Sequence, residues 1–181
     1  DLLDSGWCYL SESTQCFDTF HTPIMFPLSN DQGKVLGFSG SGWQETDSQT
    51  GKYKNSRATA IFNKSYELYH LERVKKGSGK APEIYLMEGF MDVIAAYRAG
   101  IENAVASMGT ALTSEHVEHL KRFTKKVIVT YDGDKAGQAA TAKALDELKD
   151  IPVQVVQIPD AMDPDEYLQK NSPQDLAYLL T

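Results

Sequence analysis

Apolar runs and helical periodicity alternate along the C-terminal part of the chain. Four short runs are typical of buried strands: residues 83–88, 103–107, 126–131 and 153–158. The stretches 90–100, 114–123 and 135–149 between them are typical of helices, with Gly100 suited to end the first and Thr113 to cap the second. Two short helices are expected to begin at Pro164 and Pro173, because proline is favoured at the first helical position. This alternation predicts an α/β fold with a mostly parallel sheet flanked by helices.

The first third of the chain has a different pattern. Residues 23–43 (PIMFPLSNDQGKVLGFSGSGW) predict two strands joined by a turn at 31–33, and residues 65–76 predict a helix. Residues 75–82 (KKGSGKAP) have the composition of a linker. We therefore expect a small mixed α+β subdomain over residues 1–79, followed by the α/β subdomain over residues 80–181.

Composition is that of a soluble globular protein, with 41% hydrophobic and 24% charged residues. No apolar run reaches the length of a membrane span, and the acidic N-terminus lacks the basic region of a signal peptide. Because the first residue is Asp1, not methionine, we interpret the chain as a piece of a longer protein from the cytoplasm. Cys8 and Cys16 lack the spacing of a zinc site, so we expect two buried thiols in a reducing compartment.

Charge is unevenly distributed around the net value of −7. Residues 52–80 hold eight basic and two acidic residues, whereas 1–51 hold one basic and seven acidic, and 81–181 hold nine basic and sixteen acidic. A basic island of this kind suits a nucleic-acid backbone. A solvated linker or helix face would produce the same composition.

Acidic residues follow three of the four expected strands, and ligands of open α/β sheets bind beyond the carboxyl ends of strands. Glu88 and Asp92 follow the first strand, the D-x-D pair Asp132 and Asp134 follows the third, and Asp163 and Asp165 follow the fourth. Each cluster also has a purely structural explanation, since an acid stabilises a helix N-terminus and the DPDE sequence at 163–166 fits a capping box. Their occurrence at several strand ends favours a shared site.

Carboxylates crowded at one sheet edge repel one another unless a cation lies between them. Oxygen ligands without nearby histidine or cysteine favour Mg²⁺, with Mn²⁺ as a substitute, over zinc. Gly133 would allow the D-x-D loop to turn closely. Such a metal site beside a basic island indicates phosphate chemistry on a polynucleotide.

Four segments resemble the Toprim module of bacterial DnaG-type primases: YLMEGFMDVIAAYRAG, AVASMGTAL, VTYDGDKAGQAA and IPDAMDPDEYL. Upstream, IMFPLSNDQGKVLGFSG and KYKNSRATAIFNKSYELY resemble the N-terminal part of the primase RNA polymerase core. The resemblance covers the chain from about residue 18. It implies an enzyme that synthesises RNA primers on single-stranded DNA during replication, by metal-assisted transfer of nucleotides.

Specific residues follow from that resemblance. It implies Glu88, Asp132 and Asp134 as catalytic residues, and it implies a metal-binding set of Glu88, Asp92, Asp132, Asp134, Asp163 and Asp165. It assigns template and nucleotide binding to Lys52, Tyr53, Asn55, Lys64 and Lys135. The implied partners are the DNA template, the RNA primer and nucleoside triphosphates, and we expect a nucleoid-associated monomer that does not bind membranes. In the family, zinc belongs to an upstream domain and the replicative helicase binds a C-terminal domain, neither of which these residues contain.

The chain departs from the family pattern at several positions. Ser41 stands where an arginine usually follows GFSG, no arginine precedes IMFP near Pro23, and Gln138 replaces a frequent arginine. NSRAT stands in place of NSPET. Because serine carries no positive charge, the change at Ser41 weakens the expected binding of phosphate. It does not alter the acidic residues.

Three alternatives remain open from the sequence. A Toprim nuclease or topoisomerase fragment would share the acidic motifs and cleave DNA. A receiver-like signalling domain would also alternate strands and helices, with an aspartate that accepts phosphate. A nucleic-acid-binding fragment with little activity of its own would fit the missing arginine.

Overall fold

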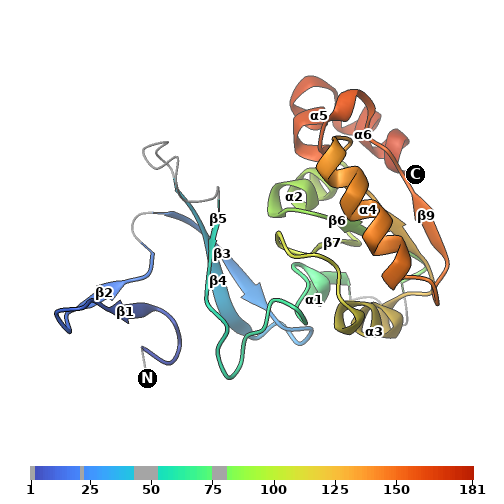
Figure 1. Cartoon of the computed structure of the whole chain (residues 1–181). Coiled ribbons are helices and arrows are strands. Elements are labelled where there is room, and N and C mark those ends of the chain that lie inside the picture. The colour runs from blue at the N-terminus through green and yellow to red at the C-terminus, as the bar shows by residue number, and fades with distance from the viewer. Residues whose placement is uncertain (1–2, 21–22, 43–52, 75–80) are drawn as a thin grey trace. The chain divides into compact units, whose positions relative to one another are not determined.

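A computed structural model describes residues 3–20, 23–42, 53–74 and 81–181. The chain divides into two compact units, residues 1–63 and 64–181, and each is described here by itself (Figure 1). The linker and the boundary expected near residue 79 fall on residues 75–80, outside the described ranges. The described part of the chain has no helix with the length and apolar character needed to cross a membrane.

Unit 1 consists of antiparallel strands. Its elements are β1 (Cys8–Leu10), β2 (Cys16–Asp18), β3 (Pro23–Ser29), β4 (Val35–Gly42) and β5 (Tyr53–Asn55). β1 pairs with β2, and β3, β4 and β5 form a second sheet in that order. The predicted hairpin over residues 23–43 is confirmed, and Asn30 closes its turn by accepting hydrogen bonds at Oδ1 from the backbone of Gln32 and Lys34, both at 3.0 Å.

Unit 2 contains a four-stranded parallel sheet. Its strands are β6 (Ile84–Met87), β7 (Ala104–Ala106), β8 (Val127–Val129) and β9 (Val153–Val155), in the order β7-β6-β8-β9. Its helices are α1 (Leu71–Val74), α2 (Phe90–Arg98), α3 (Ser114–Phe123), α4 (Lys135–Glu147), the short 3-10 helix η1 (Pro159–Ala161), α5 (Pro164–Lys170) and α6 (Pro173–Leu180). The predicted α/β fold and the four predicted strands are confirmed.

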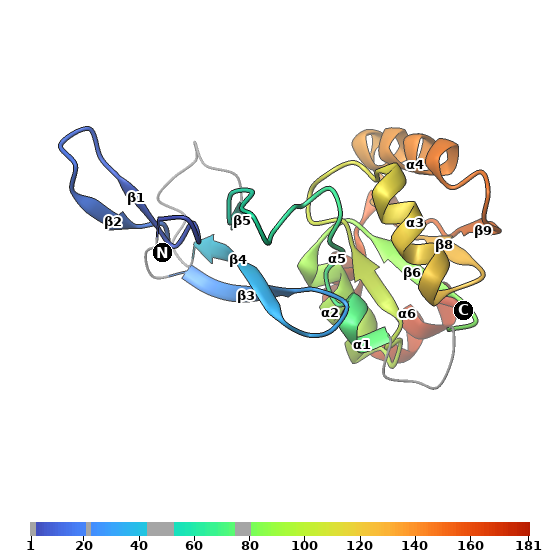
Figure 2. The ribbon, with the colours of Figure 1, turned by 90° about the horizontal axis from the view of Figure 1, so that it is seen from below.

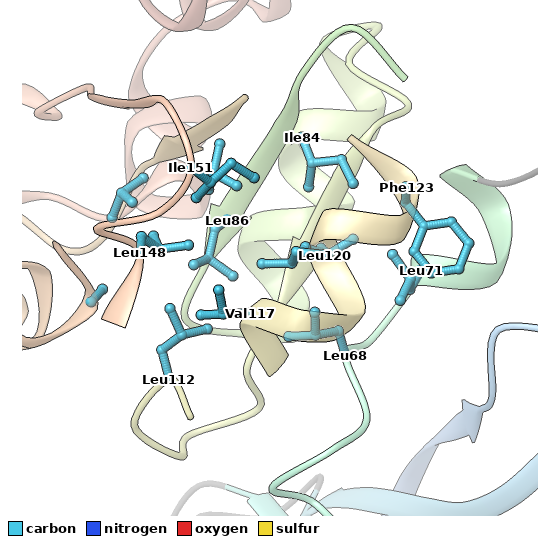
Figure 3. Packing of buried hydrophobic residues seen from close by; sticks show 14 of the residues in the cluster. Leu68, Leu71, Ile84, Leu86, Leu112, Val117, Leu120, Phe123, Leu148 and Ile151 are labelled. Atoms are coloured by element: carbon cyan, nitrogen blue, oxygen red, sulfur yellow. The ribbon is translucent and has the colours of Figure 1, made fainter. Parts of the chain in front are cut away.

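Helices cover both faces of the parallel sheet (Figure 2). On one face, residues of α3 and α4 pack with the strand residues Ile84, Leu86 and Val127; Figure 3 shows this cluster, with Leu120 of α3 between Leu86 and Leu71. On the other face, α2, α5 and α6 pack against strand residues such as Met87. Both faces of β6 are therefore buried, which explains its uninterrupted apolar sequence.

The predicted helix ends are mostly confirmed. Gly100 follows α2 with a φ of +88°, where its N–H donates to Tyr97 O at 3.0 Å and that of Ile101 donates to Ala96 O at 2.9 Å. This is the glycine-based helix stop that the sequence indicated. Pro164 and Pro173 begin α5 and α6 as predicted.

Two predictions in the N-terminal third and at its junction with the α/β part are wrong. The helix expected over 65–76 is absent from residues 65–70 and present as α1 over 71–74, because Tyr69 forms a strand-like bridge with Ala106 and His70 takes a φ of +71°. Tertiary pairing there overrides the helical pattern of apolar residues. Residues 75 and 76 lie outside the described ranges. Cys16, expected to be buried, is exposed, whereas Cys8 is buried.

Candidate active site

The two central strands, β6 and β8, carry the first two acidic clusters. Their parallel ladder pairs Leu86 with Val129, and beyond it Thr130 N donates to Leu86 O at 2.9 Å. Further along, the N–H of Asp132 donates to Oε1 of Glu88 at 3.3 Å. The sheet therefore brings the ends of two strands, and the acids that follow them, side by side.

The D-x-D loop is braced by the start of α4. Asp134 caps this helix by accepting a hydrogen bond at Oδ1 from Gly137 N at 2.7 Å. A Cβ atom at residue 137 would overlap the backbone carbonyl of Asp132, so only glycine fits. Gln138 donates from Nε2 to Gly133 O at 3.1 Å and holds the loop from the other side.

The third acidic cluster reaches the site through a strained turn. Asp160 and Ala161 both adopt left-handed φ angles, of +58° and +56°. This turn passes so close to Gly133 that a Cβ there would lie 2.8 Å from Ala161 Cα. Gly133 is thus required for close backbone approach. Strain of this kind is retained where the surrounding structure demands it, as at functional sites.

Local hydrogen bonds hold the remaining acids of the set. Asp163 caps α5 by accepting from Glu166 N at 2.7 Å, and Asp165 accepts from Gln169 Nε2 at 3.0 Å. Asp92 is buried in the first turn of α2, where its Oδ2 accepts from Gly89 N at 2.9 Å. The capping role expected for Asp163 is confirmed.

Electrostatic effects show that these acids share one neighbourhood. Burial raises the pKa of Asp132 to about 6, assisted by the charges of Glu88, Asp163 and Asp134. Burial likewise raises the pKa of Asp92 to about 8, with Asp163, Asp132 and Asp165 adding to the effect. The pKa of Glu88 is also raised, by burial and by the charges of Asp134 and Asp163. Crowded, partly dehydrated carboxylates of this kind hold protons that a cation would displace.

Whether a divalent cation can bind here depends on the carboxylates of these acids. As the side chains stand in the described part of the chain, no group of three or more histidine, cysteine or acidic residues is close enough to enclose an ion. The acids nevertheless raise one another's pKa, and all their ligand atoms are carboxylate oxygens. Oxygen donors with excess negative charge suit Mg²⁺ or Mn²⁺ after side-chain rotation.

The expected template- and nucleotide-binding residues fall in both units. Lys52 lies outside the described residues. In unit 1, Tyr53 and Asn55 lie on β5, and the buried Oδ1 of Asn55 has no hydrogen-bond partner within the described structure. In unit 2, Lys64 is partly buried, and Lys135 is exposed at the first position of α4. A lysine at the positive end of a helix is unfavourable by itself, which supports an anionic ligand near Lys135.

Three residues that contribute to this site were not predicted from the sequence. Glu166, considered only as part of a capping box, also adds to the raised pKa of Asp132. Gln138, noted only as a missing arginine, braces the D-x-D loop. Gly137 allows α4 to start against that loop. The G-D-K-A-G spacing at 133–137 could have indicated the close approach at Gly137, but the role of Glu166 depends on a tertiary neighbour and that of Gln138 on the conformation of the loop.

Comparison with known protein families identifies both halves of the chain. Residues 1–75 match the model of the DNA primase catalytic core, N-terminal domain, and residues 85–168 match a Toprim-like model. The DNA primase of Lactococcus lactis is 52% identical over 179 residues, which cover 99% of this chain and 28% of that protein. The DNA primase of Listeria monocytogenes is 45% identical over 163 residues, covering 88% of this chain and 26% of the relative.

Solved structures agree with these matches. The catalytic core of the Escherichia coli primase superimposes with a TM-score of 0.88 at 34% identity, covering 99% of this chain and 58% of the other. A DnaG primase catalytic domain bound to single-stranded DNA gives a TM-score of 0.87 at 34% identity, covering 98% of this chain and 56% of the other.

The extent of these matches defines what part of a primase the chain represents. It spans about a quarter of the length of the curated relatives and somewhat more than half of the solved catalytic cores. The two family models leave residues 76–84 and 169–181 of the chain outside both matches. The chain belongs to the bacterial DnaG-type primase family and corresponds to a part of the catalytic core that includes its Toprim module.

Proposed function

We propose that this chain forms the acidic centre of a DNA primase and takes part in RNA primer synthesis on single-stranded DNA. The observation that carries the proposal is the set of carboxylates at the ends of β6 and β8, which raise one another's pKa. Bringing these groups together has an electrostatic cost that a structural role does not explain. Nucleotide transfer supplies the reason, because its divalent cations and phosphates need such a centre.

The metal-binding set proposed here is Glu88, Asp92, Asp132, Asp134, Asp163 and Asp165. When bound, Mg²⁺ would neutralise charge on the triphosphate and the departing pyrophosphate. The protein's own part is to fix the geometry, since Asp134 and Asp163 are held by the helix starts that they cap. Glu88 has a raised pKa and is suited to accept the proton of the attacking 3′-hydroxyl.

Binding of the polynucleotide is proposed for the basic residues. Lys52, Tyr53 and Asn55 would contact template and nucleotide. Lys64 and Lys135 would contact phosphates. A related DnaG primase catalytic domain is bound to single-stranded DNA, and a related primase RNA polymerase domain to a double-stranded DNA oligomer with an overhang, which supports such contacts.

Membership of the same family indicates the location, ligands and partners of the complete protein. We propose that the complete protein acts in the cytoplasm at the nucleoid, with template, primer and nucleoside triphosphates as its ligands. Contact with the replicative helicase would require a C-terminal domain, and zinc would require an upstream domain; a relative's structure is described as containing zinc-binding and RNA polymerase domains.

A variant of Asp132 tests the proposal directly. Mn²⁺ binding by the 181-residue chain is titrated by electron paramagnetic resonance, and Asp132→Asn is expected to weaken the tightest site at least about tenfold. Incorporation of labelled nucleotide on primed single-stranded DNA is expected to fall by about 100-fold or more in Asp132→Ala. Circular dichroism should show an unchanged fold.

Asp146→Asn is the matched control, because Asp146 is exposed on the same α4 helix. It should leave both Mn²⁺ binding and incorporation unchanged. Wild-type Mn²⁺ binding by Asp132→Asn, or wild-type incorporation by Asp132→Ala, would overturn the proposal. Metal-dependent nicking of DNA without nucleotides would instead favour a Toprim nuclease.

A further inference from the structure

The segment 64–67, which carries Lys64, is attached to the N-terminus of α3 through its backbone carbonyls. Thr113 donates from Oγ1 to Ser65 O at 2.6 Å. Nε2 of His116 lies 2.9 Å from Lys64 O and 3.2 Å from Glu67 O. Nδ1 of His119, also on α3, lies 3.3 Å from Tyr66 O. All these residues belong to unit 2, so contacts to four successive carbonyls tie this short segment to one helix.

The side chains of Thr113 and His116 also build the helix cap. His116 N donates to Thr113 Oγ1 at 3.2 Å, and Thr113 N donates to His116 Nδ1 at 3.2 Å. Because Nδ1 accepts a hydrogen bond, the proton of the neutral imidazole must sit on Nε2, which then donates to the two carbonyls. Burial lowers the pKa of His116, which favours this neutral form. The cap of α3 and the attachment of residues 64–67 therefore both depend on the His116 tautomer with its proton on Nε2.

Lys64 is an unusual residue for such a rigid segment. Its side chain is partly buried, and burial lowers the pKa of its ammonium group. Within the described ranges, no carboxylate forms an ion pair with it. A partly dehydrated cation without a counter-ion costs free energy unless an anion binds there. Fixing its backbone lowers the entropy lost when that anion is bound.

We propose that Thr113 and His116 are positioning residues, which hold the backbone of residues 64–67 so that Lys64 is preorganised for a phosphate group. The phosphate belongs to single-stranded DNA or to a nucleoside triphosphate. This inference rests on the proposed function, because it assigns Lys64 to phosphate binding. In this proposal, α3 of the Toprim unit positions the backbone of Lys64.

Two substitutions separate the cap from the attachment. In His116→Asn, the amide oxygen can replace Nδ1 as the acceptor for Thr113 N, but the shorter side chain does not reach Lys64 O. In His116→Gln, the longer side chain can place an N–H where Nε2 donates in the wild type. His116→Asn should therefore keep α3 capped and lose the contacts to Lys64 O and Glu67 O, with Ser65 O still held by Thr113, whereas His116→Gln should retain the contact to Lys64 O.

Binding of fluorescein-labelled single-stranded DNA, measured by anisotropy at several salt concentrations, gives one arm of the test. Binding of a fluorescent ATP analogue gives the other arm. The ligand whose binding is weakened by the substitutions, DNA or nucleotide, is the source of the phosphate. His116→Asn is expected to weaken the responding arm roughly 3- to 10-fold, the loss typical of one well-placed hydrogen bond, and His116→Gln to restore it. Lys64→Ala should lower the salt slope of DNA binding by about 0.7 if the ligand is the strand.

A double-mutant cycle distinguishes positioning from general destabilisation. His116→Asn should have no further effect once Lys64 is alanine, because it acts through that lysine. His70→Asn is the control, since His70 also binds a carbonyl through a ring nitrogen, Ala104 O at 3.0 Å, and Asn can adopt its positive φ. It should leave both arms unchanged.

The outcomes separate this inference from the function on which it rests. If Lys64→Ala weakens neither arm, the role proposed for Lys64 itself is wrong. If Lys64→Ala weakens binding but His116→Asn does not, or if the two substitutions are additive, the positioning role is refuted while the proposed function stands.

Discussion

At the scale of single residues, the acids of this site serve two purposes at once. Asp134 and Asp163 each cap a helix, which is the structural explanation that the sequence also allowed. The same two carboxylates raise the pKa of Glu88 and Asp132. A capping hydrogen bond fixes one carboxylate oxygen and leaves the other available to a ligand. Structural and functional explanations of these residues are therefore compatible.

The pKa of Asp92 leads to a prediction about pH. In the folded chain its pKa is raised to about 8, far above that of an unfolded aspartate at about 3.9. The native state therefore keeps a proton that the unfolded state loses, so stability should fall as pH rises through this window. Asp92→Asn mimics the protonated form and should be more stable than wild type at pH 8, by about 1–3 kcal/mol, without metal.

Thermal unfolding checks this expectation in chelated buffer at pH 5 and pH 8. The variant should exceed wild type by about 2–4 °C per kcal/mol at pH 8 and by a smaller margin at pH 5, which lies closer to the pKa of the unfolded aspartate. Adding Mg²⁺ at pH 8 should stabilise wild type and reduce the difference. An equal melting temperature of the two proteins at pH 8 without metal would show that Asp92 carries no electrostatic strain.

The sequence placed correctly those acids whose neighbours follow from position along the chain, while their catalytic and metal-binding roles stay predictions. Glu88, Asp132 and Asp163 follow strands or precede helices, and their pattern was sufficient to place them together. Glu166 could not be assigned, because its role arises from Asp132 on another segment, and Gln138 could not, because its bond to Gly133 O depends on the path of the loop backbone. Gly133 was assigned to a turn, but its actual constraint is the nearby backbone of Ala161, which no local pattern shows.

At the scale of elements, α4 couples stability to the D-x-D loop. Asp134→Asn should keep the cap on α4, because the amide oxygen can still accept from Gly137 N, whereas Asp134→Ala should lose it. We expect a loss of about 1 kcal/mol in unfolding free energy for alanine and little change for asparagine. Both should weaken Mn²⁺ binding to a similar extent, since both remove the charge.

Urea unfolding and Mn²⁺ titration of the same two variants separate these effects. Equal stability of the alanine and asparagine variants would mean that the cap contributes nothing. Mn²⁺ binding retained by asparagine but lost by alanine would mean that Asp134 acts through the helix and not as a metal ligand.

Element prediction was most accurate where local pattern and tertiary structure agree. The strands β6, β7 and β8 are short, apolar and fully buried, so each was visible as a run, and the edge strand β9 was predicted although two of its three residues are exposed. β1 and β2 were missed, because three-residue strands with exposed side chains leave little periodicity. The helix expected over 65–76 failed because its first half is attached to β7 and α3 instead.

At the scale of the whole molecule, the two units differ in how much core they hold. Unit 2 contains both large buried clusters, one on each face of its sheet. We therefore expect residues 64–181, expressed alone, to unfold cooperatively and to bind Mn²⁺ with wild-type affinity, because all six proposed metal ligands lie within them. Thermal circular dichroism and Mn²⁺ titration check this.

A shortened form carrying Asp132→Asn serves as the negative control for that experiment. Retention of fold with loss of Mn²⁺ binding in the shortened wild type would show that unit 1 contributes ligands. A non-cooperative melt would show that unit 2 depends on unit 1 for its core.

The strand order β7-β6-β8-β9 has a consequence for a chain still on the ribosome. β6 and β7 can pair as soon as both have emerged, but β8 joins β6 on its other edge, and the loop to α5 follows later still. The growing chain thus carries Glu88 for some time without the aspartates that raise its pKa. Capture of a divalent cation would therefore coincide with completion of the Toprim module, and would stabilise only chains that have finished it.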